Sequence, residues 1–157
     1  MKLNHFTDIG LRICMYMAQK QQHNAATTIS ELSERLCISR NHLVKVVQFL
    51  SNNKILAATR GRGGGLRLGD KAGSIRIGQL VQLLEQSSNL INCQSISCVL
   101  DGSCLLKLAL DSAYQAFIEH LDHFSLQDVT AGKAGVLLQQ LIQPSIAISV
   151  DPVDIQA

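Results

Sequence analysis

The chain has 157 residues, 46% of them hydrophobic and 17% charged, which is enough apolar material for the core of one ordinary domain and excludes global disorder. No apolar stretch is long enough to span a bilayer, and Asp8 and Arg12 interrupt the N-terminal segment before a signal-peptide core could form. We therefore expect a soluble, cytoplasmic protein without a membrane segment.

The net charge of +2 is unevenly divided along the chain. Residues 1–69 carry ten Lys and Arg against three acids, a net of +7, whereas residues 70–157 carry four against nine, a net of −5. A basic first half of this kind favours a surface that docks on phosphate. The split indicates a nucleic-acid-binding module, with an uneven scatter of solvated charges as the alternative.

The first expected helix covers residues 5–19, where apolar residues recur at three- and four-residue steps and define one buried face. This face consists of Phe6, Ile9, Ile13, Tyr16 and Met17.

Two closely spaced helices follow. Thr28 and Glu31 have the spacing of a capping box, so the second helix is expected to start at Ile29 and to end near Cys37. Ser39 is suited to cap a third helix. That helix directs Leu43, Val46, Val47 and Leu50 inward and leaves Arg40, Asn41, His42, Lys45 and Gln48 largely on other faces. The pair is typical of a helix-turn-helix.

A β-hairpin is expected next, with strands at residues 55–59 and 66–68. The loop between them contains Arg60, Arg62 and a run of glycines, and such a hairpin after a helix-turn-helix predicts a wing. The glycine run could instead cradle the phosphates of a nucleotide, but no Gly-Lys-Ser/Thr sequence follows and the segment does not open a long helix.

Two more helices are expected, at residues 77–86 and at 104–124. The second is the longest periodic run of the chain, with a broad apolar stripe of Leu106, Ala109, Leu110, Ala113, Phe117, Leu121 and Phe124. Such a helix most simply buries its excess face against the same helix of a second subunit, which predicts a homodimer. The alternative is that it folds back on its own domain. We assign no role to residues 131–157.

Three of the five cysteines, Cys93, Cys98 and Cys104, lie on an expected loop without helical periodicity. Close Cys-x-x-Cys pairs and nearby histidines are absent, so zinc is poorly matched. A loop of this length can wrap around an iron–sulfur cluster, whose usual ligands are thiolates. A redox-switched thiol pair and inert buried cysteines remain as alternatives. We expect Cys14 and Cys37 to be small buried core residues.

An incomplete cysteine set would leave one iron of such a cluster to a weaker ligand. That iron is more open to attack by a small molecule than an iron held by thiolate, and such a cluster suits sensing.

These segments together resemble the NsrR group of nitric-oxide-sensing repressors, in a family of dimeric winged-helix regulators that also includes IscR. The similarity covers roughly residues 1–130 and is carried by Phe6–Arg12, Ser39–Lys45, Arg60–Gly69 and the three cysteines. IscR-like proteins have a slightly wider first cysteine gap and a His three residues after the third cysteine, where this chain has Lys107. That difference favours the NsrR group.

The resemblance implies a DNA-binding repressor, not an enzyme, that holds a 4Fe–4S cluster; the sequence leaves 2Fe–2S open. It assigns ligation to Cys93, Cys98 and Cys104, with a carboxylate from the partner subunit, here Asp8, as the fourth ligand. The alternative is that Asp8 offsets the helix dipole in the first turn of its helix without any metal.

The implied architecture is mainly α with a small β wing. It comprises a winged helix-turn-helix domain at residues 1–75, a cluster-binding loop and dimerisation helix at 76–130, and a C-terminal tail at 131–157. The resemblance further implies that the third helix enters the major groove of an inverted-repeat operator and that nitrosylation of the cluster releases the DNA. The expected DNA-binding residues are Ser39, Arg40, Asn41, His42, Lys45, Arg60 and Arg62. A winged-helix regulator that senses cluster supply or thiol oxidation is the alternative function.

Overall fold

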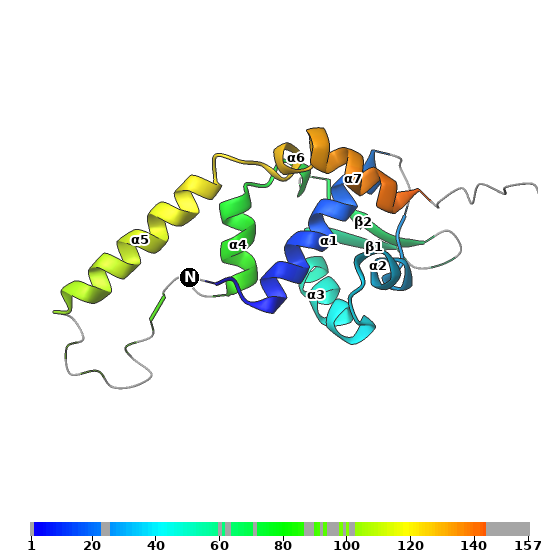
Figure 1. The fold of residues 1–157 in the computed structure, drawn as a ribbon. Helices are drawn as coiled ribbons and strands as arrows, with labels where there is room; N and C mark the ends of the chain where they lie inside the picture. Colours follow the sequence, from blue (N-terminus) through cyan, green and yellow to red (C-terminus); the bar gives the residue numbers. More distant parts are fainter. Residues whose placement is uncertain are drawn as a thin grey trace, which may run out of the picture.

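The computed structural model describes residues 2–22, 26–59, 61, 64–70, 72–86, 90–91, 93, 98, 100 and 103–143. These residues form seven α-helices, one short 3-10 helix and one two-stranded antiparallel sheet, which confirms the mainly helical fold with a small wing (Figure 1). The elements are α1 His5–Gln21, α2 Ile29–Leu36, α3 Arg40–Asn52, β1 Leu56–Thr59, β2 Gly65–Leu68, η1 Ala72–Ser74, α4 Ile77–Glu85, α5 Leu105–Leu121, α6 Leu126–Val129 and α7 Gly132–Ile142.

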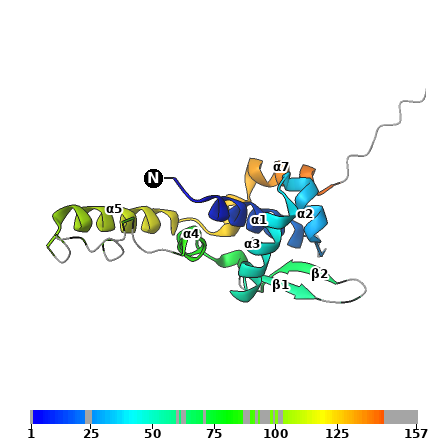
Figure 2. The same cartoon turned by 90° about the horizontal axis from the view of Figure 1, so that it is seen from below.

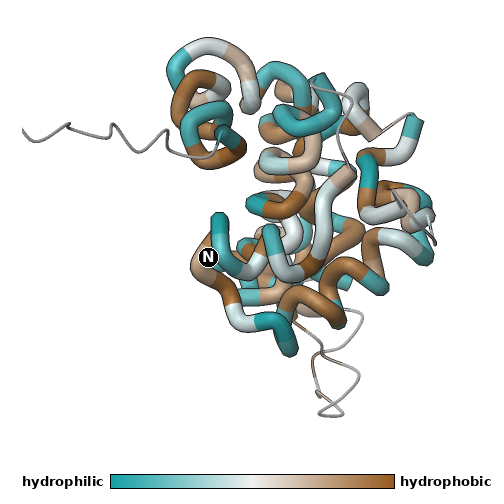
Figure 3. The backbone as a smooth tube through the Cα atoms, turned by 90° about the vertical axis from the view of Figure 1, so that its right-hand side faces the viewer, coloured by the Kyte–Doolittle hydropathy of each residue, from teal (hydrophilic) through white to brown (hydrophobic). Residues whose placement is uncertain are grey.

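Helix α1 is the centre of the core, and its predicted apolar face is confirmed. Ile9, Ile13, Tyr16 and Met17 are almost fully buried, and α1 contacts α3, α4, α6, α7 and β2. Hydrophobic and hydrophilic segments alternate along the helices, as expected when each packs one face inward (Figure 3).

The start of α1 is fixed from two directions. The Asn4 side chain caps the helix by accepting a hydrogen bond from the Thr7 amide at 2.7 Å. The Asn4 amide and side chain also donate to the Glu85 carboxylate, at 2.9 and 3.1 Å, which ties this helix start to the end of α4.

Helix α2 starts at Ile29 as predicted, but only half of the expected capping box forms. Thr28 Oγ1 accepts from the Glu31 amide at 3.1 Å. The Glu31 carboxylate instead accepts from Tyr16 Oη at 2.7 Å and from Lys20 Nζ. A hydrogen bond between two charged groups is stronger than one to a neutral backbone amide, so Lys20 is the preferred partner. The contact fastens the helix-turn-helix to α1.

Replacing Glu31 with alanine should lower the free energy of unfolding by about 1–3 kcal/mol, because the Lys20 side chain is largely buried and would lose its counter-charge. Chemical denaturation measures this. Glu34→Ala, an exposed change on the same helix, is the matched control and should stay within about 0.5 kcal/mol of the wild type. Equal effects of the two substitutions would contradict a stabilising role for this ion pair.

The same contact predicts a pH dependence. Burial raises the pKa of Glu31, but hydrogen bonds from Lys20 and Tyr16 outweigh it and hold the pKa below its ordinary value of 4.5. A carboxyl whose pKa is lowered by folding stabilises the protein above its unfolded-state pKa, and this contribution is lost as the pH falls through the lowered value. The stability difference between wild type and Glu31→Gln should therefore shrink below pH 4.5.

The wing is an antiparallel pair in which Leu56 faces Leu68 and Thr59 faces Gly65. Thr27 and Leu66 exchange two backbone hydrogen bonds, at 2.7 and 2.9 Å, which anchors the wing to the segment before α2. Gly65 has φ 152° and faces the Thr27 carbonyl so closely that a Cβ would lie 2.9 Å from it, which favours glycine there.

Helix α5 begins at Leu105 and ends at Leu121, three residues short of the predicted end. It docks on the start of α4, where the Asp122 carboxylate accepts from the Gln79 amide at 3.0 Å and the Ile77 amide donates to the Phe124 carbonyl at 2.9 Å. The rest of α5 extends away from the domain in both views (Figures 1 and 2).

The face that α5 packs against its own domain differs from the predicted stripe. Tyr114 and Ile118 are buried, with Leu110, Phe117 and Leu121 half-buried beside them. Leu106, Ala109 and Ala113, which the prediction placed on the same stripe, are exposed in the single chain, as is Phe124 beyond the helix end.

Two helices follow that periodicity did not predict. Helix α6 begins with a capping box in which Ser125 and Asp128 bond each other's backbone amides. Helix α7 packs against α1, with Gly135 buried in front of the Thr130 carbonyl. Within the described ranges, every helix is too short or too polar to cross a bilayer.

Candidate nucleic-acid interface and cysteine loop

The exposed face of α3 carries the predicted polar residues of the helix-turn-helix. Arg40, Asn41, His42 and Lys45 are all exposed. The opposite face, formed by Leu43, Val46, Val47 and Leu50, is buried in the core as expected. The helix contains no acidic residue, so its outer surface can only attract anions.

Ser39 occupies the N-cap position of α3, but its side chain makes no capping hydrogen bond. Its carbonyl accepts from the amides of His42 and Leu43, at 3.1 Å each, so the backbone alone starts the helix. The exposed hydroxyl is therefore not committed to the cap and is available at the end of the helix that would enter a groove.

Neighbouring elements position two of the polar side chains. Arg40 Nη1 donates to Ser30 Oγ of α2 at 2.7 Å. The His42 ring meets the His5 ring edge to face, with centroids 5.5 Å apart. The start of α3 is thus oriented by both α2 and the first residue of α1.

The wing residues Arg60 and Arg62 lie outside the described residues. Arg67, on the exposed side of β2, adds a basic side chain to the wing that the sequence reasoning did not select. Strand alternation could have identified it, because Leu66 and Leu68 point inward on either side of it.

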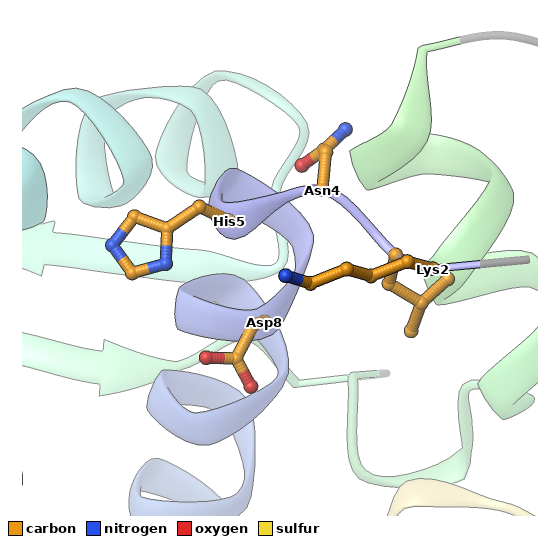
Figure 4. A pocket seen from close by; sticks show the side chains of 5 residues that line it. Lys2, Asn4, His5 and Asp8 are labelled. Atoms are coloured by element: carbon orange, nitrogen blue, oxygen red, sulfur yellow. The ribbon is translucent and has the colours of Figure 1, made fainter.

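Asp8 lies in the first turn of α1, where its Oδ1 pairs with Arg12 Nε at 3.0 Å. Both side chains are roughly half exposed. Asp8 borders a hollow of about 900 Å³ together with Lys2, Leu3, Asn4 and His5 (Figure 4). The carboxylate is therefore accessible to a group that approaches from outside the chain.

The three loop cysteines are placed as follows. Cys93 is buried, and its carbonyl accepts a hydrogen bond from the Cys98 amide at 3.2 Å. Cys104 is the N-cap residue of α5 and makes no capping bond through its side chain. None of the five cysteines, all of which lie in the described residues, forms a disulfide.

The described residues do not gather three or more His, Cys, Asp or Glu side chains into a metal site. The start of α5, which holds Cys104, lies far from the start of α1, which holds Asp8, in both views (Figures 1 and 2). The starts of α1 and α5 are therefore not neighbours within the described part of one chain.

The chemistry of the loop nevertheless fits an iron–sulfur cluster. Three thiols lie on one loop, and thiolates are the usual ligands of such clusters. Cys104 also stands at the N-terminus of α5.

The other two cysteines differ from each other. Burial raises the pKa of the Cys14 thiol to about 12, so Cys14 is an inert core residue as predicted. The expectation that Cys37 is buried was wrong. Cys37 takes the left-handed C-cap position of α2, with φ 53°, and this turns its side chain to the surface.

Comparison with solved structures gives matches of similar fold. The chain superimposes on CymR, the global cysteine regulator of B. subtilis, with a TM-score of 0.67 at 24% identity, over 87% of this chain and 98% of that one. The oxidized form of S. aureus CymR matches with a TM-score of 0.65 at 22% identity, over 84% and 98%. T. potens IscR matches with a TM-score of 0.63 at 19% identity, over 82% and 85%.

These structures share the winged-helix fold. The model of the Rrf2 family, described as iron-dependent transcriptional regulators, matches residues 3–132 and so spans the helix-turn-helix, the wing, the cysteine loop and α5. Members of this family are transcriptional regulators rather than enzymes, bind DNA and are typically dimers. The chain therefore belongs to the Rrf2 family of transcriptional regulators.

Proposed function

We propose that this regulator is a cytoplasmic, homodimeric repressor that senses nitric oxide through an iron–sulfur cluster. The proposed ligands are Cys93, Cys98 and Cys104, with Asp8 of the partner subunit as the fourth. The observation that carries the proposal is the position of Cys104 as N-cap of α5, because a group held there is joined directly to the helix with the exposed apolar face.

The DNA-reading surface of the proposal is the outer face of α3 with the wing. Arg40, Asn41 and His42 occupy the first turn of the helix, which in a helix-turn-helix contacts base edges. Ser39, Lys45 and the wing residues Arg60 and Arg62 are assigned to phosphate or minor-groove contacts. A dimer with two such helices requires two half-sites about 34–36 Å apart, and hence an inverted-repeat operator.

The Asp8 carboxylate links the proposed sensor to the reading head. Asp8 is on the first turn of α1, and His5, three residues earlier, touches His42 of α3. When bound, the cluster supplies an iron that nitric oxide can attack. Asp8 of each subunit would hold the cluster of the other, so loss of this link would leave the two reading heads without a fixed spacing. The two heads would no longer match both half-sites, so DNA affinity falls.

A regulator of cluster supply or thiol oxidation is the second candidate. The similarity to IscR and to the oxidized form of CymR supports it about as well. It uses the same cysteines, and the hydrogen bond from the Cys98 amide to the Cys93 carbonyl places the backbones of two of them close together.

The test begins with protein purified without oxygen, on which iron and sulfide are counted and the visible spectrum is recorded. An operator is then selected from random DNA, and release is followed during separate additions of nitric oxide, oxygen and an iron chelator. The proposal expects bound iron and sulfide and release at the lowest dose of nitric oxide. Colourless protein that binds DNA fully contradicts it, and release by oxidant alone favours the second candidate.

A further inference from the structure

One apolar side chain stands out on the recognition face of α3. Val44 is 41% exposed, whereas the other valines of the helix, Val46 and Val47, are at most 5% exposed. Val44 follows Asn41 by three residues and precedes Gln48 by four, so the three side chains share one face of the helix. This is the face to which the proposed function assigns DNA reading.

Folding does not require valine at this position. Valine has a lower helix propensity than alanine because its branched side chain loses rotamer freedom in a helix. Because Val44 is exposed, burial of its side chain within the chain contributes little free energy to offset that loss. A contact outside the chain would explain the residue.

The charge around Val44 decides what kind of partner fits. Arg40 and Lys45 border it, and α3 has no acidic residue, so a second copy of this basic face would be repelled. DNA supplies the matching anionic surface. In the major groove the base edges are polar except for the C5-methyl group of thymine, which is the group that apolar side chains contact.

We infer that Val44 is a specificity-determining residue that contacts the methyl group of one thymine in each operator half-site. The inference rests on the proposed DNA-binding function. Three residues of helix advance about 4.5 Å, so this thymine lies within one or two base pairs of the base read by Asn41. Asparagine pairs best with adenine, and the half-site should therefore contain a neighbouring adenine and thymine.

The experiment replaces thymines by deoxyuridine, which removes only the methyl group. An operator is first selected with wild-type protein, and each thymine of one half-site and its symmetry mate are then substituted in turn. For wild type, one position should weaken binding by about fourfold per half-site, the value of one buried methyl group. Val44→Ala should bind the thymine and uracil operators equally at that position.

Val136→Ala is the matched control, because Val136 is an exposed valine, at 57%, on the distant helix α7. Val136→Ala protein should lose affinity at the same thymine-to-uracil substitutions, and by the same factor, as the wild type. An operator that shows no uracil-sensitive thymine, or a Val44→Ala protein that keeps the full wild-type sensitivity, overturns the inference while leaving DNA binding intact. Failure of wild type to select any DNA overturns the proposed function, and the assignment of Val44 with it.

Discussion

Cys104→Ser protein purified without oxygen is expected to contain at least about tenfold less iron than wild type and to hold or release its operator without regard to nitric oxide. The substitution is well suited to the question because serine is a preferred N-cap residue. Helix α5 should therefore start as before, and the loss of iron can be ascribed to the missing thiolate. Iron analysis, circular dichroism and operator binding measure the three effects.

Cys37→Ser is the matched control for this experiment. Cys37 is an exposed thiol, but it lies at the end of α2 and outside the cysteine loop. It should keep the iron content and the nitric oxide response of wild type. If Cys104→Ser protein retains its iron, or if Cys37→Ser protein loses it, the ligand assignment is wrong.

Substitutions of Asp8 and of Arg12 distinguish a role of Asp8 as the fourth cluster ligand from a role in an ordinary surface ion pair. Both Asp8→Ala and Arg12→Ala remove the same pair, and because it is exposed each should cost at most about 0.5 kcal/mol of stability. Only Asp8→Ala also removes the carboxylate. We expect Asp8→Ala protein to bind DNA at first but to lose its cluster faster or to respond differently to nitric oxide. Identical behaviour of the two variants would reject the bridging role of Asp8.

The elements that the sequence predicted well are those in which local pattern and tertiary packing agree. In α1 the apolar period and the buried face coincide, and Thr28 marks the start of α2 by its own hydroxyl. The polar residues of α3 are exposed for the same reason, because they lie on the face of the helix opposite its buried apolar residues.

The wrong predictions concern positions where the structure depends on backbone conformation or on long-range contacts, which the hydropathy pattern of the sequence does not indicate. Helix α7 packs against α1 with Gly135 buried, where a side chain would collide with the Thr130 carbonyl, while its leucine Leu137 is exposed. Cys37 was misplaced because a left-handed C-cap is usually marked by Gly or Asn, and Cys37 takes this position without that signal. The Glu31 carboxylate does not bond the backbone amide of the N-cap residue as expected, because it pairs with the charged side chain of Lys20, eleven residues earlier.

The sequence could predict which residues are candidate cluster ligands, but not how they come together in space. The spacing of Cys93, Cys98 and Cys104 identifies three donors on one loop. The proposed contact of these cysteines with Asp8 of a partner subunit would depend on where that subunit lies, which no local pattern encodes. The structure adds that Cys104 is the N-cap residue of α5.

Ala109→Glu is expected to dissociate the dimer and to weaken binding to the full operator by about a hundredfold or more. The exposed apolar face of α5 consists of Leu105, Leu106, Ala109, Ala113 and Ala116, which follow one another around a single side of the helix. Leu105 and Leu106 are 79% and 65% exposed in the single chain. Small alanines at the centre let a second helix approach closely, and near a two-fold axis each glutamate would face its own counterpart.

The change should leave the single subunit folded, because Ala109 is exposed and glutamate is a good helix former. Sedimentation gives the oligomeric state, and binding to one half-site, compared with the full operator, isolates the loss of two-headed binding. Gln140→Glu, which adds the same charge to an exposed position on α7, should stay dimeric. A dimeric Ala109→Glu protein with wild-type operator affinity would mean that α5 serves its own domain alone, through Tyr114 and Ile118.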